Sequence, residues 1–498
     1  MENVNYSVLI ALIGYFVIVF GIGFYSLGHV SKASKGMSEG SGGFLTEYLA
    51  GSRDLGGFVL AMTMVATYLS AGSFIGGPGT AYTFGLGWIF LAMSQMPTGY
   101  FTLSVLGKKF AIIARKIDAV TVTDFLRARY QSKSIVILSS LSIIFFFIAA
   151  MSAQWIGAAR LIEGSVGISY QNALVFFAIT VLIYTTIGGF RAVALTDSLQ
   201  GIVMTLGTIA LLTATIMAGG GVGNIVQSMY EKNPGLITPY GTEEGFMTMA
   251  WVTSFWILVG FAIVGLPQVA TRAMSYKDSK SLKKGIIYGT VVSMVLLLGM
   301  HFVGAFGSVI VPGIEAGDLV VPTLTTALFP GVIAGVILAG PLAAVMSTVD
   351  SQLLIVVGAM VNDLYSNYIN PKAKQDSRLT AKVSYAATLL IGVVIFMVAF
   401  NPPPLMVWLN LYANAGLIST FIWTVLLGLY WKKANAPGAL ASIIVGTGSY
   451  ILFDYLWVRP FGLHTIVIPL LLSLLAFVAV SLSTKAPDEE VINTFWGI

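Results

Sequence analysis

Cysteine is absent from this sequence, histidine occurs three times, and charged residues make up only 9% of its 498 positions. The missing thiols exclude disulfides, thiolate metal sites and cysteine nucleophiles. The shortage of charge excludes an ordinary soluble domain, in which about 25% of residues are charged. The chain is instead 57% hydrophobic, and much of this apolar sequence lies in long runs. The composition therefore indicates an all-α integral membrane protein.

The apolar runs predict about thirteen membrane helices, since a helix needs roughly 20 residues to cross about 30 Å of hydrocarbon. We expect them at 6–28, 50–80, 84–107, 133–160, 170–188, 193–219, 248–274, 285–312, 330–365, 380–400, 404–431, 436–456 and 461–484. No small-residue cleavage site follows the first run, so we expect it to remain as a membrane helix.

The basic residues favour one orientation of these helices. With the N-terminus outside and the C-terminus in the cytoplasm, only Arg160, Lys232 and Arg459 of the 26 lysines and arginines fall on the outer side. Basic loops near membrane helices are retained in the cytoplasm. The net charge of +5 therefore reflects topology and does not indicate a nucleic acid partner.

Few stretches are polar enough to lie outside the membrane. We expect outer loops at 220–247 and 313–329, and a short interfacial helix at 119–130 on the inner side. The resulting order is an N-terminal helix with an inner loop, a five-helix repeat, an outer loop, a second five-helix repeat, and two C-terminal helices with a cytoplasmic tail. These segments are expected at 1–49, 50–219, 220–247, 248–431 and 432–498.

Two of the expected helices contain clusters of helix breakers. The second includes "SAGSFIGGPGT" at 70–80, and the seventh includes "GFAIVGLPQ" at 260–268. Each interrupted helix opens a set of five, and because five is odd the two sets lie in opposite orientations. Paired interruptions in an inverted repeat are the best pointer in a sequence to the central site of a secondary transporter.

An interrupted helix offers a binding site because its backbone is no longer fully paired. The break frees carbonyl groups for a cation and turns helix-end amides toward a solute. Glycine and proline can also merely kink a helix or allow close packing. One interruption would favour that simpler interpretation, whereas two in equivalent positions favour a transport site.

Several stretches resemble a known family. The segments "YTTIGGFRAVALTDSLQG" at 184–201 and "LAAVMSTVDSQLL" at 342–354 resemble signature stretches of the sodium:solute symporter family. The resemblance extends from about residue 7 to residue 483. It implies a LeuT-like fold, in which an inverted repeat of two five-helix units has a broken first helix in each unit. It also implies sodium-coupled uptake by alternating access across the bacterial cytoplasmic membrane.

Within the family, "FLTEYLAGSRDLGG" at 44–57 and "RAMSYKDSK" at 272–280 resemble the members that carry pantothenate. Symport of another organic solute, such as an amino acid, a sugar or another vitamin, is the alternative. The partners implied are this small solute, sodium as the co-transported ion and the lipid bilayer, with no obligate protein partner evident.

The resemblance implies a sodium site between the first interrupted helix and the ninth helix. Its ligands would be Ala66, Leu69, Ala344, Ser347 and Thr348. Backbone carbonyls and hydroxyls suit a hard cation such as sodium. The hydroxyls could equally bond to their own helix, as is common in membranes.

Two acidic residues are candidates for the sodium path. Family members place an acid at the position of Asp197, and this acid is thought to help sodium leave toward the cytoplasm. Asp197 with Gln200 also fits a capping box for the sixth helix. Asp350 departs from the family pattern, and an acid within a membrane helix is a functional candidate by default.

A site for pantothenate needs a few polar groups beside an apolar wall. The candidates for solute binding are Ser70, Ser73, Gln95, Gln154, Phe255, Trp256, Ile263, Asn410 and Tyr412. Each alone could serve in helix packing instead. We expect His301 to be a packing residue.

Two other classes of function compete with symport. A passive sodium or water channel would not need paired interrupted helices around a central site. A membrane enzyme would need a metal-ligand cluster, a nucleophile elbow or a phosphate loop, and the sequence shows none in a suitable context. We therefore expect a transporter and no enzymatic activity.

Overall fold

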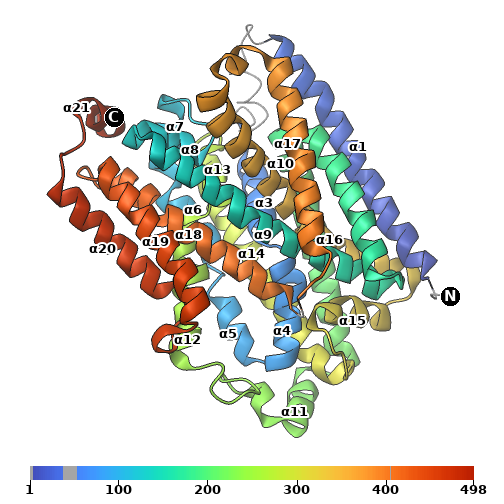
Figure 1. The fold of residues 1–498 in the computed structure, drawn as a ribbon. Helices are drawn as coiled ribbons and strands as arrows, with labels where there is room; N and C mark the ends of the chain where they lie inside the picture. The colour runs from blue at the N-terminus through green and yellow to red at the C-terminus, as the bar shows by residue number, and fades with distance from the viewer. Residues whose placement is uncertain (1–3, 37–52, 404, 498) are drawn as a thin grey trace.

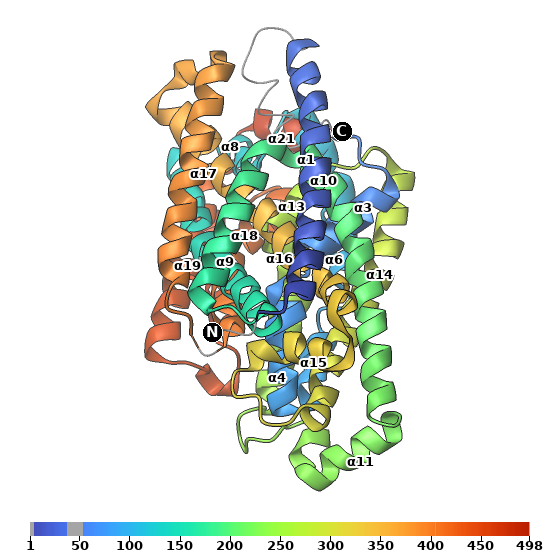
Figure 2. The same cartoon turned by 90° about the vertical axis from the view of Figure 1, so that its right-hand side faces the viewer.

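The structure is a computed structural model that describes residues 4–36, 53–403 and 405–497. Within these ranges the regular elements are helices, apart from one isolated parallel bridge between Leu55 and Tyr276. The expected all-α membrane fold is confirmed, and Figures 1 and 2 show its helices lying mostly along one direction.

The longer helices in chain order are α1 (Tyr6–Gly36), α3 (Gly57–Tyr68), α4 (Gly77–Phe84), α5 (Gly87–Met93), α6 (Thr98–Val105), α7 (Gly107–Lys116), α8 (Val122–Tyr130), α9 (Lys133–Val166), α10 (Tyr170–Ala218), α11 (Val222–Lys232), α12 (Met249–Phe255), α13 (Pro267–Met274), α14 (Ser279–Ile310), α15 (Val320–Leu328), α16 (Gly331–Val357), α17 (Ser377–Ala399), α18 (Met406–Tyr430), α19 (Ala436–Leu456), α20 (Val467–Ser483) and α21 (Glu489–Trp496). Short π and 3₁₀ segments are η2 (Gly72–Gly76), η3 (Pro234–Ile237), η4 (Trp256–Phe261), η5 (Ala262–Gly265), η6 (Gly317–Leu319), η7 (Gly358–Ile369), η8 (Pro371–Gln375) and η9 (Pro460–Gly462).

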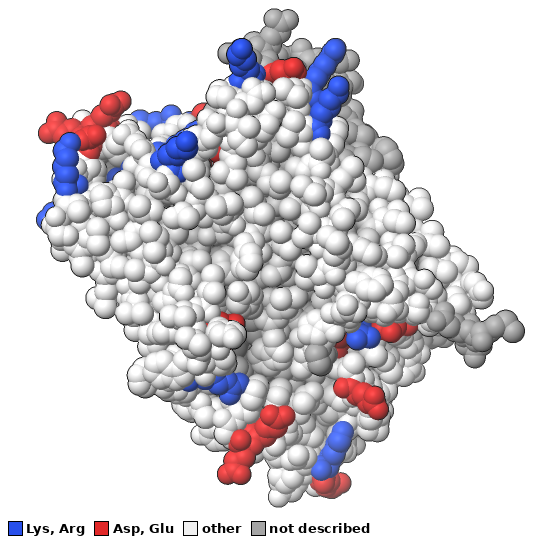
Figure 3. Space-filling view, viewed as in Figure 1, with Lys and Arg blue, Asp and Glu red and all other residues white. Residues whose placement is uncertain are grey.

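The helices are suited to a bilayer by length and composition. Among the described residues eight helices can cross a membrane, or ten if each of two bent pairs is counted as one span. Charged side chains gather at two opposite ends of the visible face, and a wide band between them carries almost none (Figure 3). The expected spans at 170–188 and 193–219 both lie within the bounds of α10, as the apolar helices Tyr170–Ile183 and Val193–Ala218. Phe176 of the first and Gln200 of the second contact the neighbouring residues Phe16 and Tyr15 of α1. A straight helix would separate Phe176 from Gln200 by about 36 Å, so the two halves of α10 lie side by side.

Helix ends are fixed by short polar side chains. The interfacial helix expected at 119–130 is α8, which begins with a capping box in which Thr121 accepts from the Asp124 backbone N–H and the Asp124 side chain accepts in return. Asn435 caps α19 by accepting from the Gly438 N–H at 3.0 Å. Each cap satisfies amides that the first helical turn leaves unpaired.

The two expected interruptions are present. The first helix ends at Tyr68, passes through an extended residue at Leu69, and resumes as η2 and α4 with a bend of 68°. The second passes through π and 3₁₀ turns to an extended residue at Leu266, and Pro267 then begins α13 after a bend of 49°. Proline suits the first helical position because the amide it lacks would be unpaired there.

The first interrupted helix packs between α14 and α16. A Cβ on Gly304 of α14 would lie 2.1 Å from the carbonyl oxygen of Pro78, so this approach requires glycine. On the other side, α16 runs through the interior of the molecule (Figures 1 and 2). Of the 18-residue apolar stretch with which this segment could cross a membrane, 83% is buried. The break is therefore enclosed by protein, where unpaired backbone is tolerated at membrane depth.

Basic residues contact the C-terminal end of α18. Lys109 donates to the Leu429 carbonyl, and the Arg129 Nε donates to the Gly428 carbonyl at 2.9 Å. Both cations also lie over the ring of Trp496 in α21, which folds back against α7 and α8. These contacts satisfy carbonyls that the last turn of a helix leaves free.

Candidate functional site

The carbonyl groups at the first break are the starting point of the site. Because α3 stops at Tyr68 and Leu69 is extended, the last carbonyls of the helix lose their usual partners. Ala66 and Leu69 are fully buried, so no bulk solvent replaces those partners. The backbone therefore needs donors from elsewhere in the protein.

Two adjacent hydroxyls of α16 reach these carbonyls. Ser347 Oγ donates to the carbonyl oxygens of Ala66 at 2.8 Å and Ala344 at 3.2 Å. Thr348 Oγ1 lies 2.9 Å from the Ala344 oxygen and 3.3 Å from the oxygens of both Ala66 and Leu69. The structure thus brings all five residues expected as sodium ligands into one buried cluster of oxygen atoms.

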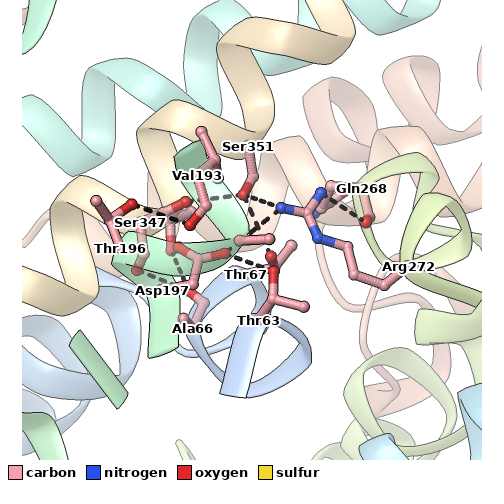
Figure 4. Close-up of polar contacts among 12 residues, drawn as sticks. Thr63, Ala66, Thr67, Val193, Thr196, Asp197, Gln268, Arg272, Ser347 and Ser351 are labelled. Atoms are coloured by element: carbon pink, nitrogen blue, oxygen red, sulfur yellow. Dashed lines mark hydrogen bonds and ion pairs between the residues drawn. The ribbon is translucent and has the colours of Figure 1, made fainter. Parts of the chain in front are cut away.

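A charged network lies beside this cluster (Figure 4). Thr63 Oγ1 donates to Asp197 Oδ2 at 2.5 Å, and the Arg272 Nη2 atom lies 3.8 Å from the same oxygen. Arg272 also donates to Ser351, whose hydroxyl in turn donates to the Ser347 carbonyl at 2.8 Å. Asp197 and Arg272 are both at most 1% exposed, so they form an ion pair away from water.

The capping box expected at Asp197 and Gln200 is wrong, because neither residue lies at a helix end. Both lie within α10, four and seven residues after Val193, where its second apolar span begins. The Asp197 side chain accepts instead from Thr63 of α3. Gln200 instead donates to the Tyr15 hydroxyl of α1 at 3.2 Å.

Asp350, the other acid expected on the sodium path, is fully buried on α16. It lies near enough to Arg272 for their charges to interact. The buried arginine therefore faces two carboxylates, one from α10 and one from α16.

A cavity opens next to the oxygen cluster, between the two interrupted helices. It comprises about 690 Å³ of space not filled by protein atoms, its openings included. Six of the nine expected solute-binding residues line it: Ser70, Ser73, Gln95, Phe255, Ile263 and Asn410. Tyr68 and Val259 add to its wall, and Thr348 joins it to the oxygen cluster. The mixture of amides, hydroxyls and apolar side chains suits an organic solute.

The other three expected residues do not line this cavity. Gln154 is fully buried behind the cavity, where its side chain accepts from the Ala71 N–H at 2.8 Å and donates to Asn410 Oδ1 at 3.2 Å. Trp256 is 47% exposed, because it directly follows the cavity residue Phe255 and adjacent residues of a helix do not face the same way. Tyr412 lines a separate cavity beside Tyr450 and Arg459.

Other cavity residues were not expected at the site, among them Trp88, Gln268, His301, Gln352 and Asn414. Gln268 could have been found from its place directly after Pro267 at the second break, and Gln352 from its spacing of four residues after Thr348. His301 was expected to be a packing residue, because nothing in the sequence places the middle of α14 against the first break.

The chain is similar to known proteins over nearly its whole length. The model of the sodium:solute symporter family matches residues 48–446. The chain is 46% identical to the sodium/pantothenate symporter of Haemophilus influenzae, covering 95% of this chain and 96% of that protein. It is also 46% identical to the sodium/pantothenate symporter of Escherichia coli, covering 98% and 99%. The osmoregulated proline transporter OpuE of Bacillus subtilis is 30% identical, covering 98% and 97%.

Solved structures show the same fold. A Na⁺-coupled sialic acid symporter in a substrate-bound outward-open state superposes with a TM-score of 0.77 at 18% identity, covering 97% of this chain and 99% of that one. Mhp1, a transporter of the nucleobase-cation-symport-1 family, superposes with a TM-score of 0.52 at 16% identity, covering 90% and 97%.

Proposed function

We propose, since the chain belongs to the sodium:solute symporter family, that it takes up pantothenate together with sodium across the bacterial cytoplasmic membrane. One observation carries the proposal. Thr348 belongs to the buried oxygen cluster and also lines the amide-containing cavity, so this single residue connects the two. An ion and a solute held by the same residue would bind cooperatively, which is what coupling requires.

The choice of solute rests on the relatives and on the cavity. The chain is 46% identical to two sodium/pantothenate symporters and 30% identical to a proline transporter. Pantothenate carries a carboxylate, an amide, two hydroxyls and a gem-dimethyl group. The amides of Gln95 and Asn410 offer partners to its polar groups, and Phe255 and Ile263 offer an apolar wall to its methyl groups.

Sodium would bind at the five residues of the oxygen cluster. The backbone carbonyls of Ala66, Leu69 and Ala344 and the hydroxyls of Ser347 and Thr348 already converge on one another. The hydroxyls would turn their lone pairs toward the ion and give up the bonds that they now donate. Asp197 and Asp350 are placed to receive the ion on its way to the cytoplasm.

Transport would proceed by alternating access. The ligands come from α3 and α16, so a movement of one helix relative to the other opens or closes the site. The two bent helices at the start of residues 50–219 and 248–431 support an inverted repeat of two five-helix units. The N-terminus would lie outside and the C-terminus in the cytoplasm, as the distribution of basic residues favours.

The test is uptake of labelled pantothenate into sealed proteoliposomes, with and without an inward sodium gradient. We expect accumulation that requires sodium and resists excess unlabelled proline or sugar. Sodium-dependent binding without pantothenate accumulation would favour the alternative, symport of another organic solute. Imposing a membrane potential then measures the stoichiometry, because one sodium with one pantothenate anion is electroneutral while a second sodium adds about 2.3 kcal/mol per 100 mV.

A further inference from the structure

His301 lies in the wall of the cavity, and its ring carries two nitrogen atoms that can form hydrogen bonds. It lies on α14 and is 2% exposed, and its ring lines the cavity opposite the amides of α18. Its Nδ1 atom lies 2.7 Å from the carbonyl oxygen of Leu297, one turn earlier on the same helix. A carbonyl oxygen can only accept, so Nδ1 must carry a proton.

The state of the other ring nitrogen follows from this bond. A second proton on Nε2 would create a buried cation, and among the described residues no carboxylate forms an ion pair with this ring. Burying an unpaired charge is costly, so the neutral ring is favoured. Nε2 then presents a lone pair and acts only as an acceptor.

Nε2 is directed at the first interrupted helix. A Cβ built on Gly77 would lie 2.4 Å from it, and Gly77 lines the same cavity. Within the described part of the chain this nitrogen has no hydrogen-bond partner. An acceptor that is held in place, lines a cavity and lacks a donor is suited to a donor on the solute.

A hydrogen-bond donor faces the cavity at Asn410 of α18, beside Gly72. The backbone N–H of Ala71 can only donate, so the side-chain atom of Gln154 that it contacts at 2.8 Å must be the oxygen. The Gln154 nitrogen therefore donates to Asn410 Oδ1 at 3.2 Å, and the Asn410 Nδ2 group is the end left for other partners. That nitrogen lies beside Gly72, where a built Cβ would approach it to 2.7 Å.

The cavity is thus polarised along the first interrupted helix. Asn410 offers a donor near Gly72, and His301 offers an acceptor near Gly77, five residues further along the chain. A solute with acceptor oxygens at one end and hydroxyl groups at the other matches this arrangement in one orientation only.

We propose that His301 accepts a hydrogen bond from a hydroxyl group of the solute and that this bond selects hydroxylated acids, with the carbonyl or carboxylate oxygens of the solute turned toward Asn410. This inference rests on the proposed function and deepens it, because it assigns the orientation of the solute and the group that is recognised. A site built to bond a hydroxyl discriminates strongly against an analogue that lacks it.

Three substitutions separate a role in binding from a role in helix structure. His301→Asn retains a side-chain N–H for the Leu297 carbonyl but is too short to present an acceptor to the cavity. His301→Gln retains a group that reaches the position of Nε2, and His301→Phe removes both functions while keeping the volume. The control is Thr290→Ala on the same helix, which loses a comparable 2.7 Å bond to its own backbone at Ile286 away from the cavity.

The measurement is sodium-driven uptake of labelled pantothenate in proteoliposomes, with competition by analogues lacking each hydroxyl or lacking the carboxylate charge. We expect the wild type to reject one deoxy analogue about tenfold, with His301→Asn and His301→Phe raising the KM for pantothenate about tenfold and losing that discrimination. His301→Gln should retain part of both, and Thr290→Ala should behave as the wild type.

Two results would overturn the inference while leaving the proposed function intact. The first is His301→Asn transporting with the wild-type KM and the wild-type preference between analogues. The second needs no variant, and so does not depend on folding: a wild type that accepts both deoxy analogues as readily as pantothenate. Failure of the wild type to accumulate pantothenate at all would overturn the proposed function and this inference with it.

Discussion

Single hydroxyl groups at residues 347 and 348 connect two helices that the chain separates by about 280 positions. Ser347 and Thr348 each donate to a carbonyl of α3 and to a carbonyl of their own helix. Their oxygen atoms are also the only side-chain members of the cluster at which we place sodium. Removing one oxygen should therefore weaken ion binding more than it weakens the fold.

We predict that Ser347→Ala and Thr348→Ala each raise the sodium concentration for half-maximal uptake about tenfold or more. An interaction with a charged group contributes about 1.5–3 kcal/mol, and alanine removes one of five ligands. The measurement is pantothenate uptake against sodium concentration in proteoliposomes. Thr215→Ala is the matched control, because the Thr215 hydroxyl donates only within α10, to Leu211. Unchanged sodium dependence in both correctly inserted variants would disprove the assignment.

The sequence indicated the sodium cluster more completely than the solute cavity, and there is a physical reason for the difference. The family resemblance implied Ser347 and Thr348 as ligands, and both lie in one regular helix that keeps them beside the first break. Trp256 directly follows Phe255, and adjacent residues of a helix point in different directions, so the two could not both line the cavity. His301 depends on the tertiary approach of α14 to Gly77, which no local pattern encodes.

At the scale of the element, the interrupted helix depends on the helices that enclose it. Breakers at 70–80 and 260–268 predicted both interruptions, because glycine and proline act locally. The bend angles of 68° and 49° depend instead on packing, including the contact of Gly304 with the backbone of Pro78. The sequence likewise predicted two spans at 170–188 and 193–219, and Phe176 and Gln200 of α10 both pack against the same part of α1, which only tertiary contacts determine.

Gly304→Ala should destabilise the protein by about 3 kcal/mol, because its Cβ would overlap a carbonyl oxygen at 2.1 Å and neither backbone can move freely. The matched control is Gly448→Ala on α19, where nothing lies within 4 Å and alanine favours the helix by about 1 kcal/mol. Thermal unfolding in detergent compares the two. Equal melting temperatures for both variants would show that α14 and α4 do not pack as described.

Across the whole molecule, basic residues bear on both the expected topology and the packing. Lys109 and Arg129 belong to the set of basic residues expected on the cytoplasmic side, and both also donate to carbonyls at the C-terminal end of α18. The expected topology needs only a count of charges in the sequence. The packing needs the fold, since α7, α8 and α18 are far apart in the chain.

The absence of cysteine provides a direct test of the orientation. Glu244→Cys lies in the loop expected outside, and Lys485→Cys follows α20 on the side expected in the cytoplasm, where the lysine side chain is 89% exposed. In intact cells a membrane-impermeant thiol reagent should label the first variant and not the second. Permeabilised cells should label both. The reverse pattern would invert the topology and place most basic residues outside.

The hydroxyl groups of Ser347 and Thr348 also bear on the step in which an unloaded carrier resets. The Ser347 hydroxyl lies 2.8 Å from the Ala66 carbonyl oxygen, and the Thr348 hydroxyl lies 3.3 Å from that of Leu69. At the site that we propose, sodium would compete with these internal hydrogen bonds, and the bonds would re-form when the ion leaves. The unloaded carrier would then reorient without leaving unpaired carbonyl oxygens in the membrane interior. A moderate affinity for sodium and a rapid transport cycle would both follow from these two hydroxyl groups.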